Sequence, residues 1–296
     1  MKKVTVKVPA KINLTLDILG VNNGYHDIES LVGSIDVYDT ITVSERKDGK
    51  INLVMKGRPV DCLIYDNNAY KASKAFIEKY GVAGVDVVID KKIPVAGGLG
   101  GSSADIAGVL NALKILYQID DDMSFLAGEL GSDTIYMLTG GYAVLKGRGE
   151  KVEKTDADRT IYLLLITDDK IISARNCYKR FDQKKKKYEG VTENAKRKLY
   201  QGDLQGLFPL LKNDLLESAV DLVPTIKNNL FALEKAGAPK ILLAGSGPTV
   251  YGLFFDKKER DNAYKKLKGL YGDDVIKAQT VVPNKSDDKK EQLSNN

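Results

Sequence analysis

Two segments at the start of the chain alternate apolar and polar residues, the pattern of β-strands that are buried on one face. They are Val4–Val8 and Ile12–Ile18, and each places an apolar side chain at every second position. Pro9 lies between them and lacks the N–H group that a strand donates, so we expect a break or a sheet edge there. The opening of the chain therefore predicts two neighbouring strands.

The following part of the chain mixes short apolar runs with amphipathic stretches. Further strands are predicted at 40–44, 50–55, 85–89, 142–145 and 161–166. Helices are predicted at 69–80, where Gly81 ends the helix, and at 103–117, 123–130 and 133–138. Because these elements do not repeat as regular strand–helix–strand units, their order indicates an α+β fold.

The sequence pattern changes after about Thr160, where predicted helices become frequent. Helices are predicted at 193–200, 204–211, 225–236 and 257–271, and strands at 241–243, 249–254 and 275–282. We therefore divide the chain into an N-terminal lobe of residues 1–158, a C-terminal lobe of residues 159–283 and a charged, flexible tail of residues 284–296. We interpret the four lysines 184–187 as a solvated loop.

Composition predicts an ordinary soluble globular protein. The chain has 296 residues, 43% of them hydrophobic, and a formal charge of +5, which suits an anionic ligand. There is no basic stripe with interleaved aromatics, so no nucleic-acid partner is expected, and the longest apolar run, 161–166, is too short for a membrane span. Cys62 and Cys177 stand far apart, which favours reduced thiols and a cytoplasmic location.

His26 is the only histidine of the chain. Zinc sites that need two histidines are therefore excluded, and any nucleophile activated by histidine would depend on this one residue. We expect carboxylates and lysines to carry most of the acid–base chemistry.

A glycine-rich segment directly before a predicted helix is the strongest functional signal in the chain. It runs Pro94, Val95, Ala96, Gly97, Gly98, Leu99, Gly100, Gly101, Ser102, Ser103, Ala104, and Asp105 follows. Glycines let the backbone approach a ligand closely, and the free N–H groups at a helix start favour an anion. The segment predicts a phosphate-binding loop, although a glycine-rich connection without a ligand is the plain alternative.

The residue order of this loop differs from that of two common nucleotide-binding motifs. A Walker A loop needs a Gly-Lys-Ser/Thr ending, which is absent, and a Rossmann turn needs Gly-x-Gly-x-x-Gly directly after a strand. Here Ser103 stands at the last position of that pattern, and Pro94 separates the loop from the preceding strand. Both motifs are therefore disfavoured.

Three more segments contain residues that could act with the loop. Lys11 lies in Pro9–Leu14, Asp133 follows Gly131-Ser132, and a second glycine loop contains Gly245, Ser246, Gly247 and Thr249. Each has a plain structural reading, as an exposed strand lysine, a helix cap and a tight turn. A phosphate loop without a histidine pair would nevertheless need a carboxylate to accept a hydroxyl proton and a cation to balance charge. Asp133 and Lys11 could supply them if they meet.

Taken together, the motifs resemble those of the GHMP kinases, in their order and spacing and over nearly the whole chain. The resemblance rests on 7–16, 23–26, 94–105, 130–133, 146–150 and 245–249. It implies a two-lobe GHMP kinase fold, with an N-terminal lobe like a domain of ribosomal proteins and a C-terminal GHMP kinase lobe. The Pro-Ala-Lys-Ile-Asn-Leu start followed by Gly-Tyr-His is similar to the branch that phosphorylates 4-diphosphocytidyl-2-C-methyl-D-erythritol.

This resemblance implies ATP and Mg²⁺ as cofactors and a cytidine diphosphate conjugate as the substrate that receives phosphate at its 2-hydroxyl. It makes Asp133 the catalytic base and Lys11 its partner, and it assigns residues 94–104 to ATP, with the loop at Gly245 in support. Asn13 would orient the substrate, and Tyr25, His26 and Tyr178 would hold the cytosine. The metal ligands stay unassigned, and we expect a monomer or a weak homodimer.

Some positions differ from the family pattern. Thr134-Ile135 follows Asp133 where the family has a small apolar residue and proline, and Ala104 stands where a hydroxyl is commoner. The alternatives are another GHMP kinase, of the homoserine or mevalonate type, a nucleotide-binding homologue with impaired catalysis, and an RNA-binding protein. Tyr25 and His26 favour a substrate that carries a base, because an acyclic substrate needs no stacking aromatic.

Overall fold

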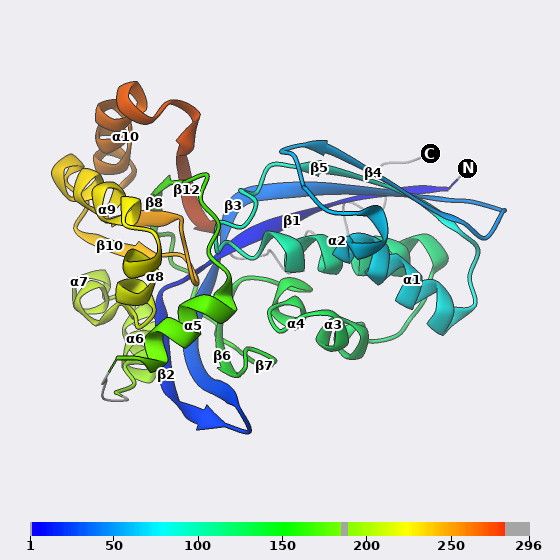
Figure 1. The fold of residues 1–296 in the computed structure, drawn as a ribbon, viewed down its shortest axis with the longest axis horizontal. Coiled ribbons are helices and arrows are strands. Elements are labelled where there is room, and N and C mark those ends of the chain that lie inside the picture. Colours follow the sequence, from blue (N-terminus) through cyan, green and yellow to red (C-terminus); the bar gives the residue numbers. More distant parts are fainter. Residues whose placement is uncertain (1, 185–188, 282–296) are drawn as a thin grey trace.

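A computed structural model describes residues 2–184 and 189–281. Two lobes lie side by side and share one twelve-stranded sheet (Figure 1). The strands are β1 Lys3–Asn13, β2 Thr15–Asn22, β3 Tyr25–Glu45, β4 Ile51–Gly57, β5 Val85–Lys91, β6 Tyr142–Gly147, β7 Lys151–Lys154, β8 Tyr162–Ile166, β9 Lys212–Asn213, β10 Lys240–Leu243, β11 Val250–Phe254 and β12 Val275–Val281. The α-helices are α1 Asn68–Tyr80, α2 Gly101–Tyr117, α3 Ser124–Leu130, α4 Thr134–Met137, α5 Ala174–Asp182, α6 Thr192–Tyr200, α7 Leu204–Leu207, α8 Leu216–Leu222, α9 Thr225–Ala236 and α10 Lys257–Tyr271. The predicted α+β class is confirmed.

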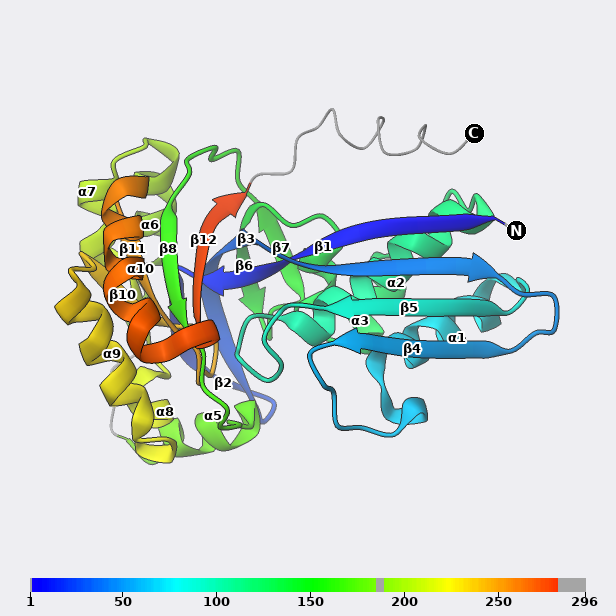
Figure 2. The ribbon, with the colours of Figure 1, turned by 90° about the horizontal axis from the view of Figure 1, so that it is seen from above.

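Strand β3 organises the sheet because it pairs with five other strands. Along its length it pairs antiparallel with β1, β2, β5, β6 and β12. Figure 2 shows β1, β3, β5 and β4 lying next to one another in the N-terminal lobe, and β12 beside β8 in the other lobe. The pairing of β12 with β3 joins the strands of the C-terminal lobe to those of the N-terminal lobe.

The first two strands differ from their predicted bounds. We expected the break at Pro9, but β1 continues through Pro9 to Asn13, and β2 begins at Thr15. Pro9 fits inside β1 because β1 pairs only with β3 and the register shifts between Pro9 and Ala10. A strand edge and a bulge both tolerate the missing N–H group.

Most of β3, and the elements β7, α5 and α8, were not predicted. Only the end of β3, residues 40–44, was expected as a strand. The predicted helix at 204–211 is instead the short α7 followed by a 3₁₀ turn, Phe208–Leu210, that contains Pro209. Proline removes a helical hydrogen bond and clashes with the preceding turn, so α7 ends there.

Helix α2 is the central helix of the N-terminal lobe and carries the glycine loop at its start. It packs on β1, β3 and α1, and its approach to the sheet is close at Gly108. A β-carbon at Gly108 would lie 2.6 Å from side-chain atoms of Val8 and Ile41. The lack of a side chain at Gly108 therefore fixes the distance between α2 and the sheet, and with it the place of the loop.

The apolar core forms two clusters. The larger lies between the N-terminal sheet and α1–α4 and continues to β8, β10, β11, α6 and α7. The smaller lies between β8, β10–β12 and the helices of the C-terminal lobe. The smaller cluster also takes Leu16 and Ile18 from β2. Because both clusters include residues from either side of residue 158, the division of the chain at that residue remains a prediction. Residues 185–187 of the predicted solvated loop and the predicted tail, 284–296, lie outside the described residues.

Candidate active site

Lys11 and Asp133 lie together, 122 positions apart in the sequence. The Lys11 Nζ atom is 3.3 Å from Asp133 Oδ2, and the Lys11 side chain is only 6% exposed. The same ammonium donates a hydrogen bond of 2.7 Å to Asn13 Oδ1, and the Asn13 amide donates to Ser30 Oγ. Residues 11 and 13 both point to this site because alternate side chains of a strand share a face. Lys11 is thus buried, held by two oxygens and fixed in position.

The Asp133 side chain does not cap a helix, although its position suggests that role. It stands directly before α4, yet it makes no capping hydrogen bond to that helix. Its carboxylate is 30% exposed and faces Lys11 instead. The reading of Asp133 as a helix cap is therefore not supported. Thr134, the residue that departs from the family pattern, is fully buried and does not prevent this contact.

The glycine loop touches Lys11 on one side and the second glycine loop on the other. The Lys11 backbone N–H donates to Leu99 O at 2.9 Å. A β-carbon at Gly98 would lie 1.9 Å from Ala244 O, and one at Gly97 would lie 2.6 Å from Thr249 Oγ1. Gly98 also has a φ of +77°, which other residues rarely adopt. Glycine is thus required at this position because two backbones are in contact there.

The first turn of α2 presents N–H groups that no side chain caps. Gly100 occupies the N-cap position in the left-handed conformation, and no capping side-chain bond is present. Ser102 Oγ accepts a hydrogen bond of 2.5 Å from Asn68 Nδ2. The early N–H groups of a helix lack intrahelical acceptors and carry partial positive charge. Over a helix of this length they form a site that suits phosphate oxygens.

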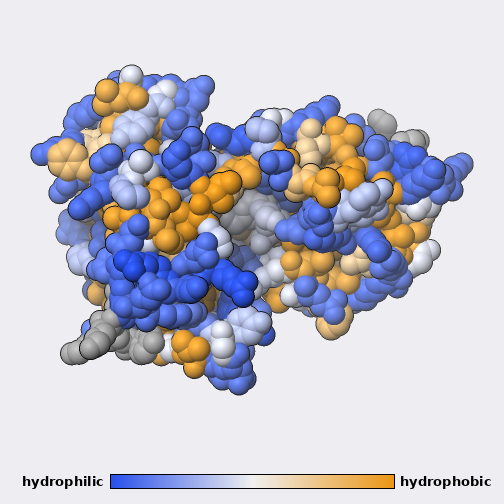
Figure 3. Space-filling model, in the orientation of Figure 1, coloured by the Kyte–Doolittle hydropathy of each residue, from blue (hydrophilic) through white to orange (hydrophobic). Residues whose placement is uncertain are grey.

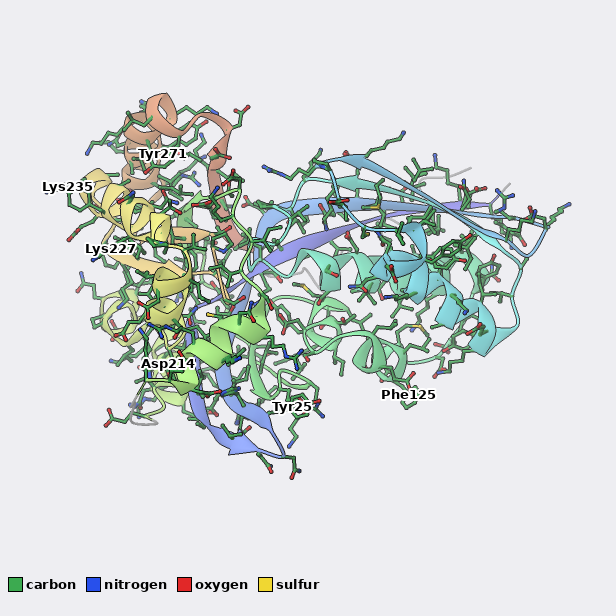
Figure 4. The ribbon with its side chains drawn as sticks, viewed as in Figure 1. Tyr25, Phe125, Asp214, Lys227, Lys235 and Tyr271 are labelled. Carbon is green, nitrogen blue, oxygen red and sulfur yellow. The ribbon has the colours of Figure 1, made fainter. Side chains whose placement is uncertain are left out.

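Two of the residues predicted to hold a base, His26 on β3 and Tyr178 on α5, lie beside one another. His26 and Tyr178 stack with ring centroids 4.6 Å apart, and Phe181 meets His26 edge-on at 6.3 Å. Tyr25 is 57% exposed (Figure 4). Burial raises the pKa of the Tyr178 hydroxyl, and the Asp133 charge raises it further. His26 and Tyr178 are thus in direct contact, and the Tyr25 ring is open to solvent.

Comparison with known proteins identifies the family. Residues 67–144 match the N-terminal domain of GHMP kinases, and residues 195–273 match the C-terminal domain. A protein of Macrococcus caseolyticus named 4-diphosphocytidyl-2-C-methyl-D-erythritol kinase is 34% identical over 268 residues, covering 88% of this chain and 94% of its own. The chain belongs to the GHMP kinase family. It is therefore a small-molecule kinase.

Solved structures of GHMP kinases have the same fold. A crystal structure of 4-(cytidine 5'-diphospho)-2C-methyl-D-erythritol kinase superposes with a TM-score of 0.79 at 26% identity, covering 93% of this chain and 98% of that one. Mevalonate kinase from L. major, solved with R-mevalonate, reaches a TM-score of 0.76 at 16% identity, covering 96% of this chain and 97% of that one. The second likeness shows the shared fold alone.

A buried charge cluster beneath the glycine loop of this GHMP kinase was missed by sequence reasoning. Lys91 Nζ lies 2.6 Å from Asp39 Oδ2 and from Asp105 Oδ2, and it donates to Gly101 O at 3.0 Å. Asp39 Oδ1 accepts from the N–H groups of residues 92 and 93. One signal was available, because the alternation of β5 places Lys91 on the same buried face as Val85, Val87 and Ile89. The cluster ties β3, β5 and the start of α2 together.

Asp105 is the member of this cluster whose carboxyl group is not fully hydrogen-bonded. Burial raises the pKa of its carboxyl to about 7, against the lowering effect of Lys91. Its Oδ1 atom has no hydrogen-bond partner among the described residues. A buried oxygen without a partner favours the protonated carboxyl, which can donate a hydrogen bond.

Asp182 was also missed. His26 Nε2 lies 2.7 Å from Asp182 Oδ1, so the carboxylate holds the imidazole by accepting its N–H. Asp182 ends α5, and α5 was not predicted because its sequence is mostly polar.

The predicted Mg²⁺ would be bound together with ATP. Within residues 2–184 and 189–281, no three His, Cys, Asp or Glu side chains gather as a metal site. Mg²⁺ that accompanies a nucleotide is usually held by one or two side chains together with phosphates, so it does not require such a group. Among the same residues, no helix is long and apolar enough to cross a bilayer.

Proposed function

We propose that this GHMP kinase uses ATP to phosphorylate the 2-hydroxyl of 4-diphosphocytidyl-2-C-methyl-D-erythritol, a step of non-mevalonate isoprenoid precursor synthesis. The observation that carries the proposal is the contact between Lys11 and Asp133 at 3.3 Å beside the glycine loop. The names of the relative from Macrococcus caseolyticus and of the solved kinase support the choice of substrate.

The side chains at the site suit phosphoryl transfer to an alcohol. ATP with Mg²⁺ supplies the phosphoryl group when bound. The N–H groups at the start of α2 would hold phosphate oxygens, since no side chain caps them. Asp133 would take the proton of the attacking hydroxyl, and the Lys11 ammonium would offset the negative charge that develops on its oxygen. Asn13, bonded to Lys11, would orient the same hydroxyl. Positioning and charge compensation supply most of the catalysis in such reactions.

The aromatic residues favour a substrate that carries a base. His26, Tyr178 and Tyr25 would provide flat rings for the base, and His26 adds a polar edge that Asp182 holds in place. Homoserine and mevalonate carry no ring to stack on them. We therefore prefer the cytidine conjugate over these two substrates, which other kinases with this fold use according to their names.

An assay of ADP release with a panel of alcohols tests the proposal. We expect the purified protein to release ADP with the cytidine diphosphate conjugate and not with homoserine or mevalonate. Release with mevalonate or homoserine alone would refute the proposed substrate. Binding of ATP without turnover of any alcohol would indicate the homologue with impaired catalysis.

We also propose a cytoplasmic monomer or weak homodimer. Cys62 and Cys177 are both free thiols, which suits a reducing compartment. Size-exclusion chromatography with light scattering tests the oligomeric state, and a stable tetramer would contradict it.

A further inference from the structure

The turn between β6 and β7 lies against the proposed catalytic carboxylate. A β-carbon at Gly149 would come within 3.2 Å of Asp133 Oδ1, and Gly149 has a φ of +108°. The turn is braced from inside, because Glu150 Oε2 accepts the backbone N–H of Arg148 at 2.6 Å. Arg148, directly before Gly149 in this turn, therefore starts from a fixed backbone beside the site.

The Arg148 side chain extends from this turn to the aromatic group on β3. Its guanidinium carbon lies 4.2 Å from the centroid of the Tyr25 ring, a cation–π contact. Tyr25 stays more than half exposed, so its ring can still receive a base. Figure 4 shows Tyr25 beyond the end of β6 and β7, on the side of the molecule where α5 lies. Arg148 thus bridges the base-binding side of the site and the Asp133 side.

Arg148 differs from Lys11 and Lys146, two other cations near the site, in having no acidic partner. Lys11 is engaged by Asp133, and Lys146 lies within 3.4 Å of Glu29, Glu153 and Glu193. Among the described residues, Arg148 makes no ion pair. The surface beside it, over α5, is strongly hydrophilic (Figure 3), and Arg175 and Lys179 of α5 are exposed there. The turn therefore presents an unneutralised positive charge to a ligand.

From this placement we infer that Arg148 binds the diphosphate of a nucleoside diphosphate conjugate and so determines substrate specificity. The inference rests on the proposed function, in which the base lies at Tyr25 and His26 and the reacting hydroxyl lies at Asp133. The diphosphate joins these two parts of the substrate, so it passes the residue that spans them. A planar guanidinium can donate two parallel hydrogen bonds to phosphate oxygens, which an ammonium cannot match in geometry.

Binding of CDP and of cytidine to Arg148→Gln, Arg148→Lys and the unchanged protein tests the inference by titration calorimetry, without ATP. We expect Arg148→Gln to weaken CDP binding by about 10-fold or more, since a charge-assisted hydrogen bond contributes on this order. Cytidine, which has no phosphate, should bind within about twofold of the unchanged protein. Arg148→Lys should recover part of the loss. Lys227→Gln removes the same charge from the exposed far side of α9, and it should change neither ligand.

In turnover assays, Arg148→Gln should raise the KM for the conjugate by a similar factor and leave the KM for ATP unchanged. An equal loss of CDP and cytidine binding would mean that Arg148 only supports the Tyr25 ring, and it would overturn the inference. Unchanged CDP binding in Arg148→Gln would overturn it as well. These results differ from failure of the proposed function, in which the unchanged protein itself would bind neither ligand and phosphorylate no conjugate.

Discussion

At the scale of single residues, two side chains of the candidate site do not have the structural roles that their positions suggest. Asp133 stands at a helix start without capping it, and Lys11 lies on a strand but is buried. Neither state follows from local propensity, which favours an aspartate that caps and a lysine that reaches solvent. Local rules that fail together at one place are typical of a functional site.

Replacing Asp133 with asparagine separates catalysis from folding. Asp133→Asn keeps the shape of the side chain, and no helix-capping bond is lost because none is present. We expect a folded protein whose turnover falls by about 10²- to 10⁴-fold, the usual loss for a positioned general base. Circular dichroism checks folding, and ADP release checks turnover. Asp169→Asn, at an exposed aspartate, is the matched control and should keep full activity. Turnover near the normal rate in Asp133→Asn would remove Asp133 from the catalytic role.

Asp105 predicts a pH dependence of stability. Burial raises the pKa of its carboxyl to about 7 in the folded protein, above its ordinary value near 4. The folded state therefore binds this proton more tightly than the unfolded state. The resulting stabilisation is complete below about pH 4 and is lost as the pH rises through about 7.

Asp105→Asn isolates this effect because asparagine cannot titrate. We expect the free energy of unfolding of the unchanged protein, minus that of Asp105→Asn, to fall between pH 4.5 and 7.5. The slope cannot exceed about 1.4 kcal/mol per pH unit for one proton. Urea unfolding at several pH values measures it, and the subtraction cancels groups that both proteins share. A difference that stays constant or rises with pH would contradict the raised pKa.

At the scale of elements, local sterics made some parts predictable. The bounds of α9 and α10 agree with the sequence, as does the end of α1 at Gly81, whose φ of +62° glycine readily adopts. The glycine loop was also recognisable, because close backbone approach requires residues without a β-carbon. Such features depend on neighbours in the sequence, so they can be read from it.

Other elements depend on contacts with segments that are distant in the sequence, so the local sequence does not predict them. Residues 30–35 of β3 are all buried, since strands and helices cover both sides of this segment. A strand buried on both faces loses the alternation by which strands are recognised, and its two serines further obscured it. Only Cys177 and Phe181 of α5 are buried, and the other positions of this helix are largely polar. Asp182 and Tyr178 owe their places to this helix, so their geometry could not be predicted.

At the scale of the whole molecule, the site is assembled from segments that meet only in the folded chain. Lys11 comes from β1, Asp133 from the turn before α4, and Tyr178 from α5 in the other lobe. The contact of Gly98 with Ala244 likewise joins the glycine loop to the C-terminal lobe. Sequence resemblance could bring these residues to attention, but the distances follow from the shared sheet.

Thr280 is the residue through which this union of the lobes can be tested. It is buried on β12, opposite Ile35 of β3, and its Oγ1 atom accepts the backbone N–H of Ile161 at 2.8 Å. The same oxygen lies 2.8 Å from the Tyr142 hydroxyl of β6. One hydroxyl therefore serves strands of both lobes.

Thr280→Val keeps the shape of the side chain but leaves the Ile161 N–H group buried without its acceptor. We expect the free energy of unfolding to fall by about 1–3 kcal/mol, the usual cost of an unsatisfied buried group. Unfolding in urea should remain a single transition for fluorescence and circular dichroism alike, because the sheet and both core clusters still cross between the lobes. Thr5→Val removes an exposed hydroxyl whose partner is Thr42, so its cost should be much smaller. Equal losses in the two variants would show that the buried Thr280 hydroxyl adds nothing to the union of the lobes. Two separate transitions in Thr280→Val would show that the shared sheet and core clusters do not suffice to couple the lobes.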